Sequence, residues 1–409
     1  MLMELPNEIL VLIIQAVDRD LTDLRNLALT CRALLPVTRE ELFSESIVNV
    51  CALLEPHIRP YSDHITKLRI EEPNSESNNV ANGRFIPYLD PHALPRLTTL
   101  YFNGLNAWFF VKMPTSFYQA LSSLTSVTTL ALGSVYFVNF RQIQASVCSL
   151  PSLSELSLQD VGYIPWTGDM PEGYDQWAEG LPEITTRPRL SRLMIAPSSA
   201  TEDVVPWLAS GPSKDSLTTL VVPHRANTPQ KVLSHFGPNI EHLSIHLHEY
   251  GNKTYYTRII KGYTNLRTLR LVLDALVEAP HAWTLDVLRM LGFWIRAQHL
   301  HTIAIDVLIP CDVLERCEWQ LDAQLDWDKL RLLDGVLAGP KFAVLDTVEF
   351  TVQWIGEWDP EEEMRAALAK RIEETLRKVA ETRRLVTSVR GMKEVLPRAH
   401  RQGPRPEAA

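Results

Sequence analysis

The chain has 409 residues, of which 45% are hydrophobic, 22% charged and 8% aromatic, and these values exclude wholesale disorder and a collagen-like or membrane class. Its net charge of −9 repels a polyanion, so the composition gives no sign of nucleic-acid binding. No apolar run approaches the roughly 20 residues that span a bilayer. We therefore expect a soluble protein with no nucleic acid and no membrane among its partners.

The cysteines and the missing motifs argue against metal, cofactor and catalytic sites. The five cysteines form no Cys-x-x-Cys pair, which predicts buried reduced thiols in a cytoplasmic or nuclear protein: Cys31, Cys51, Cys148, Cys311 and Cys317. The sequence contains no phosphate-binding Gly-rich loop, no Gly-x-Ser-x-Gly and no His-Glu-x-x-His. We expect no metal, no cofactor and no enzymatic activity. An enzyme whose site has no linear signature is the alternative.

The first part of the chain predicts three short helices. Apolar residues recur at helical spacing over residues 6–17, and a second stripe follows over 20–31, with Asp20 as its N-cap. A third segment covers residues 36–43. Helices this short bury little apolar surface among themselves, so their exposed stripe indicates a partner surface. A cap that docks on the rest of the chain is the alternative.

Four dipeptides in this segment carry a family resemblance: Leu5-Pro6, Glu8-Ile9, Asp20-Leu21 and Cys31-Arg32. In this order they resemble the F-box, over residues 4–46. The Trp residues that many family members have after Cys-Arg and at the end of the third helix are replaced by Leu34 or Leu35 and by Phe43. The resemblance implies binding to the Skp adaptor of a cullin–RING ubiquitin ligase. It implies that the following side chains contact that adaptor: Leu5, Pro6, Ile9, Leu10, Ile13, Leu24, Leu27, Cys31 and Phe43.

The middle of the chain repeats the unit apolar-x-x-Leu-x-apolar, in which Ile or Val sometimes replaces Leu. Ten copies occur: Ile65-Leu68-Ile70, Leu97-Leu100-Phe102, Val127-Leu130-Leu132, Leu153-Leu156-Leu158, Leu190-Leu193-Ile195, Leu217-Leu220-Val222, Ile240-Leu243-Ile245, Leu266-Leu269-Leu271, Leu300-Ile303-Ile305 and Leu345-Val348-Phe350. Segments between the copies are typical of helices, among them 116–124, 140–150, 228–236 and 284–299. Each unit is therefore predicted to be one strand and one helix.

This pattern resembles leucine-rich repeats, which stack into an elongated α/β solenoid with one continuous core. The Asn or Cys that such repeats place three positions after the last apolar residue is replaced here by Leu105, Val135, Val161, Ser198, Arg225, His248 and Asp274. We therefore expect an irregular solenoid. A conventional α/β sheet is the alternative, but ten units exceed what one open sheet usually holds.

Side chains between the apolar positions should line the opposite face of the strands, because strand side chains alternate. One predicted column is Thr99, Thr129, Glu155, Arg192, Thr219, His242, Thr268, Thr302 and Thr347. The next is Tyr101, Ala131, Ser157, Met194, Val221, Ser244, Arg270, Ala304 and Glu349. The following side chains are the candidates for binding a protein substrate: Glu155, Arg192, His242, His246, Arg270 and Glu349.

Two further features leave alternatives open. His242, His246 and His248 share one strand face, but residues four apart on a strand lie about 13 Å apart, so a solvated or partner-facing row fits better than a metal site. The aromatic loop 163–177 fits both a substrate-gripping element and a lid over the repeat edge.

The composition changes after Pro360. An apolar stripe formed by Met364, Leu368, Ile372, Leu376 and Val379 predicts a C-terminal helix over residues 361–390 that caps the solenoid. The Arg- and Pro-rich tail at 391–409 is typical of disorder, and a nuclear-targeting role for it is the alternative.

Together these features predict an α/β protein with a three-helix F-box at 1–46 and a leucine-rich-repeat-like solenoid at 47–360. The whole resembles fungal-type F-box proteins. The resemblance implies a substrate-recognition subunit of a Skp–cullin–F-box ligase, which positions an unknown protein substrate and does not catalyse. A scaffold that binds partners without ubiquitin-ligase activity is the alternative.

Overall fold

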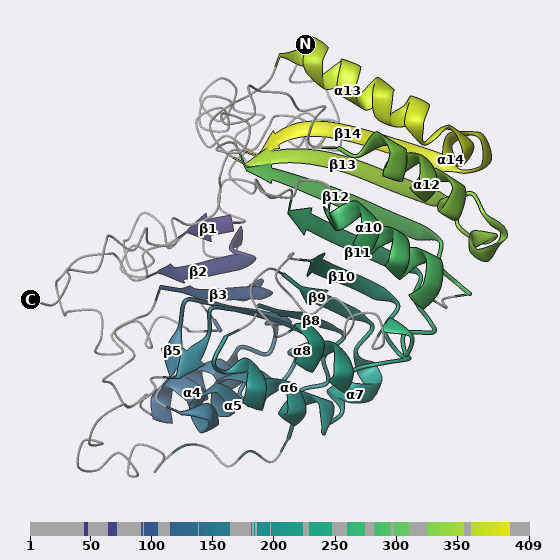
Figure 1. Cartoon of the computed structure of the whole chain (residues 1–409). Helices are drawn as coiled ribbons and strands as arrows, with labels where there is room; N and C mark the ends of the chain where they lie inside the picture. Colours follow the sequence, from purple (N-terminus) through teal and green to yellow (C-terminus); the bar gives the residue numbers. More distant parts are fainter. Residues whose placement is uncertain are drawn as a thin grey trace, which may run out of the picture. The chain divides into compact units, whose positions relative to one another are not determined.

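Figure 1 shows the computed structural model of the chain. It describes residues 45–47, 64–71, 91–104, 115–163, 181–223, 229–247, 260–274, 282–310, 325–355 and 361–392, apart from 93, 138, 182–183, 185, 197 and 296–297. The chain divides into two compact units, unit 1 (Met1–Leu217) and unit 2 (Thr218–Ala409). The predicted F-box side chains, Leu5 to Phe43, lie outside the described residues, as do most of the loop 163–177 and the tail beyond Met392.

Unit 1 contains a parallel sheet whose strand order follows the chain order. Its strands are β1 (Glu45–Ile47), β2 (Lys67–Glu71), β3 (Thr99–Asn103), β4 (Thr129–Gly133), β6 (Glu155–Gln159) and β8 (Arg192–Ile195). A separate pair is formed by β5 (Tyr136–Phe137) and β7 (Gly162–Tyr163). The helices are α4 (Thr115–Ser123), α5 (Phe140–Cys148), α6 (Thr201–Ala209) and α7 (Ser213–Ser216).

Unit 2 repeats this architecture with longer strands. They are β9 (Thr219–Val222), β10 (His242–Leu247), β11 (Thr268–Asp274), β12 (Thr302–Pro310), β13 (Thr347–Ile355) and β14 (Arg384–Met392), parallel and again in chain order. The helical elements are α8 (Pro229–His235), α10 (Ala282–Arg289), the π-helix η7 (Met290–Trp294), α12 (Trp327–Leu337), the 3-10 turn η9 (Pro340–Phe342), α13 (Glu362–Thr375) and α14 (Arg377–Thr382). In Figure 1, α10 and α12 lie over one face of the β11–β14 strands.

The repeat pattern locates the core. All ten predicted copies coincide with strands, β2 to β4, β6 and β8 to β13, and their apolar positions are buried. Helices pack on this apolar side: the ring of Phe117 on α4 meets Phe102 on β3 edge to face at 6.1 Å, and Trp283 on α10 lies 6.5 Å from Phe350 on β13. The period of two along each strand therefore separates a helix-covered apolar face from a second, polar face.

In both units a shared carbonyl links most strands to the next. The Thr98 carbonyl accepts hydrogen bonds from the backbone N–H groups of Thr128 (2.9 Å) and Thr129 (3.0 Å). The carbonyls that accept two such bonds are those of Thr66, Thr98, Thr128 and Ser154 in unit 1 and of Thr218, Glu241, Arg267 and His301 in unit 2. Because the acceptor lies immediately before its strand in every case, neighbouring strands begin at equivalent residues.

In unit 1 a side-chain bond reinforces this link. The hydroxyl of Thr98 donates to the Thr66 carbonyl (3.1 Å), and the hydroxyl of Ser191 donates to the Ser154 carbonyl (3.2 Å). Thr128 and Ser154 make the same contact at 3.5 and 3.4 Å. A Ser or Thr before each of β3, β4, β6 and β8 thus ties one repeat to the preceding repeat. These hydroxyl bonds take the place of the Asn ladder that the sequence lacks.

Three successive strands of unit 1 end in a left-handed residue. Gly104, Ser134 and Asp160 have φ values of 65°, 49° and 54°, and they directly follow β3, β4 and β6. The N–H of Ser134 donates to the Gln159 carbonyl at 2.8 Å, and the Asp160 carboxylate accepts the Tyr136 hydroxyl at 3.3 Å. These local bonds offset the steric cost of the left-handed backbone at two non-glycine residues.

The predicted C-terminal helix over 361–390 is wrong beyond Thr382. The helices α13 and α14 end at Thr382, and residues 384–392 form β14, which pairs with β13 along its whole length. A strand, not a helix, is therefore the last member of this sheet order. Of the predicted stripe, Leu368, Ile372, Leu376 and Val379 are buried, whereas Met364 is exposed.

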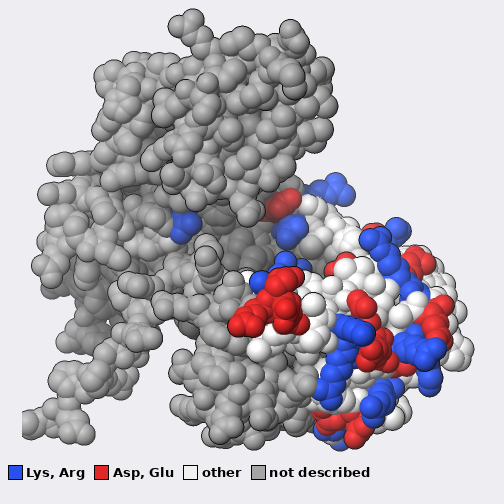
Figure 2. Space-filling model, turned by 90° about the horizontal axis from the view of Figure 1, so that it is seen from above, with Lys and Arg blue, Asp and Glu red and all other residues white. Residues whose placement is uncertain are grey.

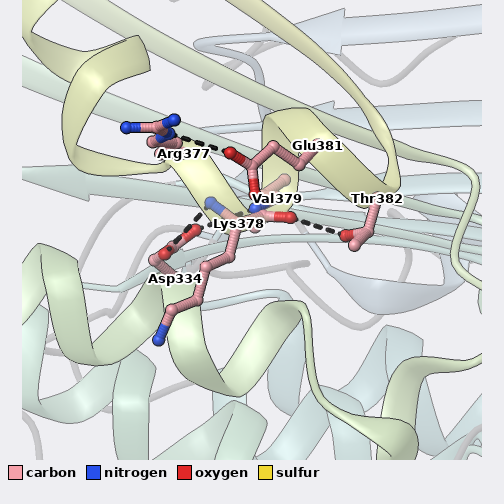
Figure 3. Close-up of polar contacts among 6 residues, drawn as sticks. All are labelled: Asp334, Arg377, Lys378, Val379, Glu381 and Thr382. Atoms are coloured by element: carbon pink, nitrogen blue, oxygen red, sulfur yellow. Dashed lines mark hydrogen bonds and ion pairs between the residues drawn. The ribbon is translucent and has the colours of Figure 1, made fainter.

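The turn from α13 into β14 depends on a buried carboxylate from another helix. Asp334 on α12 is buried and accepts backbone bonds from Val379 (2.9 Å) and Lys378 (3.3 Å) in the first turn of α14 (Figure 3). The N–H groups of a first helical turn have no acceptor within the helix, so a carboxylate supplied by α12 satisfies them. In the same turn, Arg377 pairs with Glu381 at 2.8 Å.

We predict that Asp334→Ala lowers the free energy of unfolding by about 1–2 kcal/mol, because it removes the acceptor for two N–H groups. Urea denaturation measures the change. Asp328→Ala, on the exposed side of the same helix, loses only a surface pair with Arg331 and should cost less than about 0.5 kcal/mol. Equal effects of the two substitutions would contradict this role of Asp334.

Candidate binding face

The side chains of the polar face form columns across the strands. In unit 1, Thr99, Thr129, Glu155 and Arg192 are successive register partners on β3, β4, β6 and β8. In unit 2, Thr219, His242, Thr268, Thr302 and Thr347 are partners on β9 to β13, and Arg384 of β14 continues the row. The second predicted column has the same register within each unit. The predicted columns are thus confirmed within each unit.

Two of the candidate residues in unit 1 form a weak surface pair. Glu155 and Arg192 lie directly opposite each other, with Nε of Arg192 4.0 Å from a carboxylate oxygen of Glu155. Both side chains are about half exposed, at 44% and 53%. A pair this long and this exposed contributes little to stability, so both charges remain accessible to a partner.

Arg270 in unit 2 has a different environment. Its Nε bonds to a carboxylate oxygen of Asp306, which is on the next strand, two residues beyond Ala304, the register partner of Arg270. The Asp306 side chain is only 5% exposed, whereas that of Arg270 is 49% exposed. A buried carboxylate is costly unless it is paired, so Asp306 depends on Arg270 and holds the guanidinium at the polar face.

His246 makes a similar diagonal pair. Its Nε2 lies 2.8 Å from Oδ1 of Asp274 on the adjacent strand, and both side chains are largely buried. His242, four residues earlier at the start of β10, is exposed, and His248 lies outside the described residues. Among the residues that the structure describes, no group of three or more His, Cys, Asp or Glu side chains is arranged to hold a metal ion.

Glu349 is the remaining candidate, and it is exposed on β13. It lies in the same column as Arg270, with Ala304 of β12 between them. The structure therefore divides the six candidates. Arg270 and His246 are tied to acidic partners, Glu155 and Arg192 form a loose pair, and His242 and Glu349 are exposed.

The sequence prediction missed the acidic partners. Asp306 and Asp274 belong to the polar face of β12 and β11, beyond the six-residue unit used to find the repeats. Continuing the period of two past that unit would have placed both on the same face as Arg270. β14 was missed because its apolar positions, Leu385 and Val389, are separated by Thr387 and follow a helix-forming segment.

A second row of charges lies at the start of the unit 2 strands. Arg267 Nε is 3.2 Å from Glu241, and His301 Nδ1 is 2.8 Å from Asp346. Glu241, Arg267 and His301 carry the shared carbonyls, and Asp346 lies directly before β13, in the places that Ser and Thr hold in unit 1. Where unit 1 uses hydroxyls to join its repeats, unit 2 uses an Arg–Glu pair and a His–Asp contact.

Charges of both signs lie close together on part of the described surface. Figure 2 shows Lys and Arg interspersed with Asp and Glu among the described residues that are visible in that view. Several charges are neighbours within one helix, such as Arg331 with Asp328 and Arg377 with Glu381.

The described cysteine is poorly suited to nucleophilic chemistry. Burial raises the pKa of the Cys148 thiol to about 11, and the nearby Arg187 lowers it only in part. The reactive thiolate is therefore a small fraction at neutral pH. Burial and the bonded Asp203 likewise raise the pKa of Tyr163, whose hydroxyl donates to that carboxylate at 2.9 Å.

No protein-family model matches the chain, and no curated protein is significantly similar to it. Within the described ranges, no helix combines the length and the hydropathy needed to cross a membrane.

We predict that Arg270→Ala lowers the free energy of unfolding by about 2–3 kcal/mol, because it leaves the Asp306 carboxylate buried without a counter-charge. Arg192→Ala, which breaks an exposed pair, should cost less than about 0.5 kcal/mol. Urea denaturation of both variants tests the difference. Replacing the pair together, as Arg270→Met with Asp306→Leu, should recover most of the loss; no recovery would contradict the assigned dependence.

Proposed function

We propose that this chain is a non-catalytic substrate-recognition subunit of a Skp–cullin–F-box ubiquitin ligase. In this proposal, residues 1–46 form a three-helix F-box that binds the Skp adaptor, and the polar face of the repeats binds a protein substrate. The protein then acts in the cytoplasm or the nucleus, where that ligase operates.

The observation that carries the proposal is the ordered F-box-like pattern of the first 46 residues. Leu5-Pro6, Glu8-Ile9 and Cys31-Arg32 follow one another at the family's positions. An amphipathic segment of this size needs a partner to cover its apolar stripe. The Skp adaptor is the partner that the resemblance implies.

The array that follows supports the second half of the proposal. Parallel strands in chain order, most of them joined to the next through a shared carbonyl, are what a leucine-rich-repeat-like solenoid requires. Helices cover the apolar side, so the columns of polar side chains are left for recognition. Binding surfaces of stacked repeats are built in this way from many dispersed residues.

Binding to the purified adaptor tests the F-box assignment. The variant Leu5→Ala, Pro6→Ala, Ile9→Ala should bind the adaptor at least about tenfold more weakly, because it truncates three apolar contacts. The matched control is Phe293→Ala with Leu332→Ala, which removes exposed apolar side chains (75% and 63%) from the helices of unit 2. Calorimetry with the full chain measures both. Unchanged affinity in the triple variant would overturn the F-box assignment.

A scaffold that binds the adaptor without recruiting the ligase is the second candidate. The two are separated by reconstituting the adaptor, cullin and RING subunits with the full chain and a co-purified protein. Ubiquitin chains on that protein, absent with the triple variant, support the substrate receptor. Adaptor binding without ubiquitin transfer supports the scaffold.

A further inference from the structure

Arg270, Ala304 and Glu349 form a charged triplet on the polar face of unit 2. They are register partners on β11, β12 and β13, which lie side by side in Figure 1. The outer two carry opposite charges, and the small Ala304 between them is buried. The column thus has a small side chain at its centre, with a positive side chain on one side and a negative side chain on the other.

The positive end is held in place. The Arg270 Nε bond to the buried Asp306 fixes the guanidinium, and within the described part of the chain this is the hydrogen bond the structure gives Arg270. A guanidinium has five N–H donors, so its terminal nitrogens remain available to a carboxylate. Thr268 and Thr302 lie in the neighbouring column and carry further hydroxyl donors.

The negative end is an exposed carboxylate. Glu349 has Ala304 on one side and Val386 of β14 on the other, neither of which carries a charge. It can therefore accept a bond from a partner's Lys or Arg without first breaking an ion pair to either neighbour in its column. The triplet thus offers a partner a positively charged donor at Arg270 and a negatively charged acceptor at Glu349.

The spacing of the two strand positions favours one conformation in the partner. Neighbouring strands lie about 4.8 Å apart, so the Cα atoms of Arg270 and Glu349, two strands apart, are about 9.6 Å from each other. A polyproline II segment rises about 3.1 Å per residue with three residues per turn, so its residues i and i+3 point to the same side about 9.3 Å apart. A segment in this conformation that crosses the strands matches the column.

We propose that unit 2 binds an extended segment of its protein substrate that carries an acidic residue opposite Arg270 and a basic residue three positions away, opposite Glu349. This inference rests on the proposed function only in calling the segment a substrate. Binding of the segment requires neither the Skp adaptor nor residues 1–46.

Proline-based peptides test the proposal on the full chain. The matched probes are acetyl-Pro-Pro-Glu-Pro-Pro-Lys-Pro-Pro-amide and the same peptide with Glu and Lys exchanged, since the structure leaves the direction of the segment open. The control peptide has the same composition with Glu and Lys adjacent. Labelled with fluorescein, one matched probe should bind about two- to fivefold more tightly than the control, because the control can pair with only one of the two charges at a time.

Charge reversal at the negative end gives the decisive comparison, because Glu349 is not involved in the buried pair. Glu349→Lys should reverse the preference, so that a peptide with Glu at both positions binds more tightly than the matched probe. Glu363→Lys makes the same charge change at an exposed position of α13 and should leave the preference as it is.

Three results would overturn the proposal: equal binding of the matched probes and the control peptide, no binding of any peptide, or an unchanged peptide preference in Glu349→Lys. These results are independent of the F-box assignment. If the chain does not bind the adaptor but shows the peptide preference, the proposed ligase role is wrong and this site stands. If it binds the adaptor but shows no peptide preference, only this site is wrong.

Discussion

The shared carbonyl that precedes most of the described strands is the constraint on which the architecture of both units depends. A carbonyl such as that of Thr98 or Arg267 accepts hydrogen bonds from two N–H groups of the following repeat, so a one-residue slip would break both bonds at once. Such a slip would also turn every buried apolar side chain of the strand outward. Register is therefore set twice, by hydrogen bonds at the strand start and by burial along the strand, and the polar columns are a direct consequence.

The two units use this frame differently. Unit 1 keeps short strands and joins its repeats with Ser and Thr hydroxyls, whereas the strands of unit 2 lengthen from four residues in β9 to nine in β12 to β14. The added residues bring Asp274 and Asp306 onto the polar face, where they pair with His246 and Arg270. The longer strands thus create a face on which Arg270 and His246 are oriented by acidic side chains that are buried or largely buried.

Much of this was accessible from the sequence, because the core depends on a short local pattern. The apolar-x-x-Leu-x-apolar unit located ten strands, and the period of two then assigned the columns that contain Arg270 and Glu349. Side-chain pairing was not accessible, since it joins residues 28 to 36 positions apart, as in His246 with Asp274 and Arg270 with Asp306. The strand β14 was misassigned because the helical period of the preceding segment was extended across Arg383, where the backbone becomes extended.

At the proposed substrate site, a partner segment contacts equivalent residues on successive strands. The site therefore requires that the strands follow one another in chain order and share a common register. Pulsed electron paramagnetic resonance tests this in unit 2. In a chain whose five native cysteines are replaced by Ser, spin labels are attached to Thr219→Cys and to either Thr347→Cys or Arg384→Cys. These sites lie four and five strands apart in one column, so the Cα separations should be about 19 and 24 Å. An increase of about one strand spacing between the two pairs is the expected result; equal distances, or a shorter distance to residue 384, would contradict the ordered sheet and the binding face built on it.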